Sequence, residues 1–122
     1  MILKRTCSIL IVDDDRVQHM INRKILLRCD PSLKLHFFEN PLEALDWLQE
    51  NSADLLLLDI NMPEMKGWEF LEIMIQRQIK MEVKMFSSSI DPRDVEKSKN
   101  YDLVTGFLVK PLNNAVIYEL LH

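Results

Sequence analysis

The chain has 122 residues, which is the size of one typical domain, and 48% of them are apolar, enough for a sizeable core. Its 19 acidic and 15 basic residues give a net charge of −4, which disfavours a nucleic-acid-binding surface. The apolar runs are too short to cross a membrane, and the N-terminus lacks the apolar stretch of a secretory signal. We therefore expect a single cytoplasmic domain over residues 1–122, without an output domain.

Strand and helix patterns alternate along the whole chain. Five short apolar segments have the composition of buried strands: residues 7–12, 33–38, 55–58, 83–86 and 107–109. Helical patterns follow each of them, beginning near residues 16, 40, 67, 91 and 113. In the first of these helices, the apolar residues at helical spacing are Val17, Met20, Ile21 and Ile25.

Two of the helix starts carry a specific signal, because Asn40 and Asp91 each precede a proline at the first helical position. The alternation predicts (βα)5, and right-handed crossovers then make all five strands parallel. The expected fold is a doubly wound, flavodoxin-like three-layer α/β sandwich with a five-stranded sheet in the order 2-1-3-4-5.

Polar side chains stand at the carboxyl ends of four predicted strands. They are Asp13, Asp14 and Asp15 after the first strand, Asp59 after the third, Ser87, Ser88 and Ser89 after the fourth, and Lys110 after the fifth. Ligands of open α/β sheets bind at this edge, where the strand order reverses between strands 1 and 3. We therefore expect Asp13 and Asp14 to face Asp59, with Ser87 and Lys110 on the far side.

Converging carboxylates cannot all stay ionised without a counter-charge. A hard divalent cation is the simplest one, and oxygen ligands suit Mg²⁺. A carboxylate beside a metal, a lysine and a hydroxyl is a suitable in-line acceptor of a phosphoryl group. Each residue alone has an ordinary explanation, such as one aspartate capping a helix, but their joint placement indicates a functional site.

Four segments resemble the receiver domain of response regulators, and the resemblance covers the whole chain. They are ILIVDDD (9–15), LLLLDINMPEMKG (55–67), MFSSS (85–89) and GFLVKP (106–111). The resemblance, which extends to stand-alone chemotaxis-type receivers, implies a phosphorylation-activated switch of two-component or phosphorelay signalling. It implies no enzyme beyond Mg²⁺-dependent self-phosphorylation and self-dephosphorylation. The implied phosphodonor is a histidine kinase or a histidine phosphotransfer protein.

The resemblance implies a role for each residue of the acidic cluster. Asp59 looks like the phosphoacceptor and also a metal ligand. Asp13 and Asp14 look like the Mg²⁺ acids, with Asp14 the more direct ligand, and the main-chain carbonyl of Asn61 completes the set. Lys110 resembles the family's phosphate-binding lysine. Asn61 also occupies a position that tunes dephosphorylation in the family.

Other positions match the family's switch. Ser87 stands where a Ser or Thr hydroxyl follows the phosphoryl group, and Phe107 occupies the aromatic switch position, usually Tyr. Pro111 is expected to follow a cis peptide bond. Ser88 fits the small residue beside the phosphoryl site, and Ser89 the second position that tunes dephosphorylation. The segment 101–106 lacks the usual Gly-Ala, which puts the shape of that loop in question.

The fourth predicted helix is the expected responsive element, because Val95 is its single clear inward apolar residue. The expected partner surface is the face formed by helix 4, strand 5 and helix 5. Its candidate contacts are Lys97, Lys99, Tyr101 and Tyr118. The downstream protein target is unknown, nucleic acid and membrane are not expected as partners, and a phosphorylation-dependent homodimer is left open.

Two other functions compete with this one. The first is a haloacid-dehalogenase-type phosphatase, in which Asp13 would be the nucleophile and Asp15 the acid of a D-x-D-x-[TV] motif. That scheme needs an acidic pair after Lys110, where Glu119 is the sole acid, and it leaves NMPEMKG without a role. The second is a receiver-like interaction module that is never phosphorylated. Uptake of a phosphoryl group at Asp59 distinguishes all three.

Overall fold

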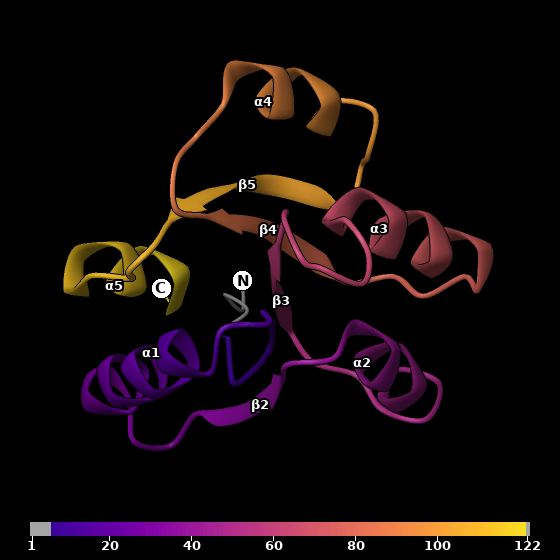
Figure 1. The fold of residues 1–122 in the computed structure, drawn as a ribbon. Helices are drawn as coiled ribbons and strands as arrows, with labels where there is room; N and C mark the ends of the chain where they lie inside the picture. The colour runs from indigo at the N-terminus through magenta and orange to yellow at the C-terminus, as the bar shows by residue number, and fades with distance from the viewer. Residues whose placement is uncertain (1–5, 122) are drawn as a thin grey trace, which may run out of the picture.

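The computed structural model describes residues 6–121 and contains a five-stranded parallel sheet in the order β2-β1-β3-β4-β5. The strands are β1 (Ser8–Val12), β2 (Lys34–Phe38), β3 (Leu55–Asp59), β4 (Glu82–Ser87) and β5 (Val104–Val109). The helices are α1 (Arg16–Cys29), α2 (Pro41–Trp47), α3 (Gly67–Gln76), α4 (Pro92–Ser98) and α5 (Asn114–Leu121). Figure 1 shows α1 and α5 on one face of the sheet and α2, α3 and α4 on the other. The predicted fold and strand order are confirmed.

The central strands β1 and β3 anchor the molecule. Every residue of β3 is buried, and so are the last four residues of β1. Their side chains alternate between two cores: Leu56 and Leu58 pack on the α2–α3 side, whereas Leu55 and Leu57 pack on the α1–α5 side. Each buried side chain of this size contributes about 1.5–3 kcal/mol to folding. The edge where these strands end is therefore a rigid platform.

The helices start where their capping residues predict. Asn40 Oδ1 accepts a hydrogen bond from the Leu42 amide at 2.8 Å, and Asp91 Oδ1 accepts one from the Arg93 amide at 2.9 Å. The fifth strand is longer than predicted, since it begins at Val104, which pairs with Val83 across an irregularity in the ladder. The fifth helix was expected to reach His122, which lies outside the described residues.

Helix α1 turns an unexpected face to the sheet. Its predicted apolar stripe points largely to solvent: Val17 and Met20 are each 61% exposed. The buried residues are instead His19, Asn22 and Leu26. The apolar spacing therefore does not mark the inner face of this helix, and the polar side chains of His19 and Asn22 enter the interior.

Helix α4 is weakly anchored, as predicted. All its residues are at least partly exposed, and Val95 is half-buried. The segment that follows α4 is attached to α3, because the ring of Tyr101 stacks on Trp68 at the start of α3 with 5.5 Å between centroids. Among residues 6–121, no helix has both the length and the apolar character that spanning a membrane requires.

Candidate functional site

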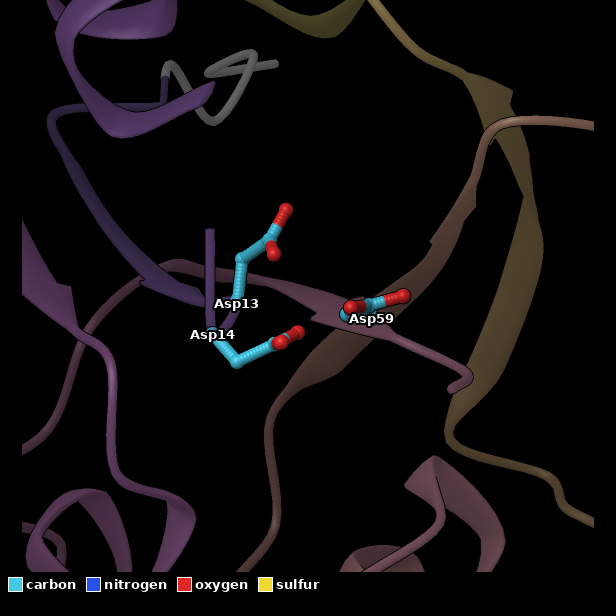
Figure 2. A group of neighbouring side chains, drawn as sticks. All are labelled: Asp13, Asp14 and Asp59. Carbon is cyan, nitrogen blue, oxygen red and sulfur yellow. The ribbon is translucent and has the colours of Figure 1, made fainter. Parts of the chain in front are cut away.

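Three acidic side chains converge at the carboxyl edge of the sheet. Because Val12 of β1 pairs with Leu58 of β3, the residues that follow, Asp13 and Asp59, end adjacent strands. One carboxylate oxygen from each of Asp13, Asp14 and Asp59 lies within 4.8 Å of the others (Figure 2). Asp13 and Asp59 are buried and Asp14 is exposed. The cluster is therefore open to solvent on the side of Asp14.

Lys110 enters the cluster from the end of β5. Its Nζ lies 2.6 Å from Asp13 Oδ2 and 3.4 Å from Asp59 Oδ2, and its side chain is 11% exposed. The backbone holds it in place, since the Lys110 amide donates to the Ser87 carbonyl at 2.8 Å and the next peptide bond, to Pro111, is cis. The predicted cis bond is confirmed, and a single ammonium faces two buried carboxylates.

Burial raises the pKa of Asp59 from 3.8 to about 7. The Lys110 ammonium acts in the opposite direction and the Asp13 carboxylate in the same direction as burial. The Asn61 amide, which donates to Asp59 Oδ1 at 3.2 Å, lowers the pKa to a smaller degree. The cluster thus carries more negative charge than Lys110 balances.

The donor set fits Mg²⁺. Carboxylate oxygens are the hard ligands this ion prefers, and a divalent charge would offset the negative charge of three carboxylates that share one lysine. Asp13, Asp14 and Asp59 are the side chains placed to hold it. The main-chain carbonyl of Asn61 remains a predicted fourth ligand.

The hydroxyl of Ser87 is engaged within its own loop. Ser87 Oγ donates to the Ser89 carbonyl at 2.7 Å and accepts from the Ser89 amide at 3.3 Å. Ser87 is buried, whereas Ser88 and Ser89 are exposed beside it. The hydroxyl has a single hydrogen, so donating it to a group on Asp59 requires the Ser87 side chain to leave the Ser89 carbonyl.

Phe107 lies half-buried in β5, and its ring packs against the core on the α2–α3 side. It also lines a hollow of about 420 Å³ between α4 and β5, together with Val95 and Tyr101. An aromatic ring at this position has space to move toward or away from α4.

Two residues beside the site were missed by the sequence analysis. Lys66 Nζ donates to Asn61 Oδ1 at 2.9 Å, and His19 Nε2 lies 2.7 Å from the carbonyl oxygen of Asp13. The Lys66 contact carries no sequence signal, because it spans an isolated antiparallel bridge between Asn61 and Lys66 that no helix or strand pattern predicts. His19 does carry one, since His19, Asn22 and Leu26 form an alternative helical stripe at i, i+3 and i+7.

Comparison with known proteins now places the chain in a family. The model of the response regulator receiver domain matches residues 9–122. The chain belongs to this family. As a receiver it is a signalling component of two-component systems, and aspartate phosphorylation and Mg²⁺ binding are typical of such domains. This membership favours a signalling role over the phosphatase alternative.

Curated relatives support the assignment. The transcriptional regulatory protein DcuR of Escherichia coli K12 is 29% identical over 93% of this chain, which covers 48% of DcuR. The cyclic di-GMP phosphodiesterase response regulator RpfG of Xanthomonas campestris is 43% identical over 52% of this chain, which covers 17% of RpfG. The chain thus spans about half or less of these relatives.

Solved structures agree closely in fold. A two-component response regulator from Cytophaga hutchinsonii has a TM-score of 0.85 and 28% identity, covering 96% of this chain and 95% of its own. The chemotaxis protein CheY4 of Vibrio cholerae has a TM-score of 0.77 and 27% identity, covering 93% and 94% of the two chains.

Proposed function

We propose that this chain is a phosphorylation-controlled switch, residues 1–122 forming one receiver domain that works in the cytoplasm. In this proposal Asp59 accepts a phosphoryl group from a phosphohistidine of a histidine kinase or phosphotransfer protein. The observation that carries the proposal is the position of Asp59, a buried carboxylate flanked by the acids of β1 and by Lys110.

The proposed reaction moves one phosphoryl group. A carboxylate oxygen of Asp59 forms a bond to phosphorus, while the P–N bond of the donor breaks and its electron pair leaves on the imidazole nitrogen. Lys110, whose Nζ lies 3.4 Å from Asp59 Oδ2, would balance charge on the transferred oxygens. Mg²⁺ bound by Asp13, Asp14 and Asp59 would supply further neutralisation of those oxygens.

We propose that phosphorylation then draws the Ser87 hydroxyl away from the Ser89 carbonyl and toward Asp59. Phe107 is expected to follow, because it has free space in the hollow beneath α4. The output surface would be α4, β5 and α5, where Lys97, Lys99 and Tyr118 are exposed. Tyr101 is half-buried against Trp68 and would be presented to a partner if α4 shifts.

The exposed face of α1 suits the phosphodonor. Val17 and Met20 present apolar surface on the helix that follows the acidic residues 13–15, and the charged residues of the helix are all basic: Arg16, Arg23, Lys24 and Arg28. An apolar patch with a basic rim favours a partner whose surface combines apolar and acidic side chains.

The test is an intact mass of the protein after incubation with Mg²⁺ and a small phosphodonor such as acetyl phosphate. We expect a gain of one phosphoryl group that requires Mg²⁺ and is absent in Asp59→Asn. A gain that survives Asp59→Asn but not Asp13→Asn would support the phosphatase alternative. Complete absence of a gain in the wild-type protein would support the unphosphorylated interaction module.

A further inference from the structure

A buried histidine contacts the backbone between Asp13 and Asp14, the two acids that follow β1. His19 is 8% exposed, and its Nε2 lies 2.7 Å from the carbonyl oxygen of Asp13 and 3.3 Å from that of Phe38. The ring meets Phe37 edge-on with 5.1 Å between centroids. His19 thus joins the ends of β1 and β2 beneath the acidic cluster.

The two carbonyl oxygens beside His19 Nε2 determine whether this nitrogen donates or accepts a hydrogen bond. A carbonyl oxygen can only accept a hydrogen bond, so Nε2 carries the hydrogen and donates to both oxygens. Nδ1 is buried and has no hydrogen-bond partner within residues 6–121. Within residues 6–121, the buried ring of His19 therefore forms hydrogen bonds only through Nε2. The apolar Val17 and Met20 of the same helix face solvent instead.

The carbonyl oxygen that His19 binds lies in the backbone between Asp13 and Asp14. The carbonyl of Asp13 belongs to the planar peptide unit that connects Asp13 to Asp14, so rotation of that plane changes the direction of the Asp14 side chain relative to Asp13. The Asp13 carboxylate is already held, since Oδ1 accepts from the Asp15 amide at 2.9 Å and Oδ2 faces Lys110. The exposed Asp14 carboxyl interacts with the Asp59 carboxyl of the same cluster, and the Asp13–Asp14 peptide plane sets the direction in which its side chain leaves the backbone.

We propose that His19 is a positioning residue for the metal site, which locks the Asp13–Asp14 peptide plane so that both carboxylates are directed at one ion. This inference rests on the proposed Mg²⁺-dependent function. Partners that orient metal ligands typically change metal affinity by 10- to 100-fold when they are removed. His19 would act in this way through the backbone rather than through a ligand side chain.

The test compares His19→Met with His19→Gln, two side chains of equal length of which only Gln can donate an N–H. We expect His19→Met to weaken Mg²⁺ binding about tenfold, measured by calorimetric titration, and His19→Gln to remain near the wild-type affinity. The matched control is Asn22→Leu, which removes a fully buried amide of the same helix face that has no hydrogen-bond partner within residues 6–121. It should leave Mg²⁺ affinity unchanged.

Thermal unfolding without Mg²⁺ separates positioning from general stability. A His19→Met protein that is less stable yet binds Mg²⁺ as tightly as wild type would overturn the proposal, as would equal weakening in Asn22→Leu. If His19→Met does not fold, His19→Phe takes its place, since it keeps a ring against Phe37. A wild-type protein that takes up no Mg²⁺ would refute the proposed function as well, whereas normal wild-type binding with no difference between variants refutes this inference alone.

Discussion

The Lys110 ammonium lies 0.8 Å closer to the carboxylate of Asp13, at 2.6 Å, than to that of Asp59, at 3.4 Å. The buried lysine is therefore paired chiefly with Asp13, which directly follows β1. Asp59 is left partly uncompensated, and burial then raises its pKa to about 7. The residue proposed to accept the phosphoryl group is thus the buried acid with the longer ion pair to Lys110.

This imbalance predicts a pH dependence of stability in protein stripped of divalent cations. The folded-state pKa of Asp59, about 7, lies above its ordinary 3.8, so the folded state binds the proton more tightly. The stability that the folded state gains from protonation of Asp59 is fully present below about pH 4 and is lost as pH rises toward 7. Asp59→Asn should remove this dependence and be more stable by about 1–2 kcal/mol at pH 8. Urea unfolding at pH 5 and pH 8 measures it, and an equal pH effect in both proteins would contradict it.

A methyl group at Gly67 should damage the site. A Cβ there would lie 2.7 Å from the carbonyl oxygen of Asp59 and 3.1 Å from the Cα of Ile60, and neither backbone atom can move freely. We expect Gly67→Ala to lower the free energy of unfolding by about 1–3 kcal/mol and to slow phosphorylation. Gly106→Ala is the control, because its Cβ would meet only the flexible end of Lys84, at 3.3 Å. If Gly67→Ala and Gly106→Ala lose equal amounts of unfolding free energy and phosphorylation rate, the crowding at Gly67 is not the cause of the loss.

The stack of Tyr101 on Trp68 should determine how firmly α4 is held. Lys97 lies over the Trp68 ring at 5.5 Å, and the Tyr101 hydroxyl donates to Glu72 at 2.8 Å. Tyr101→Leu should cost about 0.5–1.5 kcal/mol and speed amide hydrogen exchange in α4. Tyr118→Leu, at a residue 66% exposed, should do neither. Unchanged exchange in Tyr101→Leu would mean that other contacts anchor the helix.

Phe107→Ala should separate phosphorylation from its structural response. The ring packs on the core beside α4, away from the acidic cluster. Uptake of phosphoryl from acetyl phosphate should therefore be unchanged, whereas the change in α4 hydrogen exchange on phosphorylation should be reduced. A full response in the variant would exclude Phe107 as the aromatic switch.

The exposed apolar residues of α1 provide a test of the donor surface. Val17 and Met20 are each 61% exposed, so replacing both by Ser should change stability by no more than about 0.5 kcal/mol for each residue. Transfer from a phosphohistidine donor should slow, while phosphorylation by acetyl phosphate should not. If both reactions keep their wild-type rates, the donor docks elsewhere.

The sequence alone determined the sheet order and the residues that gather at its edge. Parallel strands bring their carboxyl ends together, so Asp13, Asp59 and Lys110 could be placed near one another from strand assignment alone. Helix starts were equally accessible, because capping by Asn40 and Asp91 is a local interaction.

Only the tertiary structure decided which face of α1 is buried. Local apolar spacing favours Val17 and Met20 as the inner face, but the buried carbonyl of Asp13 needs a hydrogen-bond donor, and His19 supplies it. The same holds for Lys110, whose preference for Asp13 over Asp59 depends on differences below 1 Å. Spacing along a chain predicts which groups meet, whereas the hydrogen bonds and charges that must be satisfied after they meet depend on three-dimensional distances.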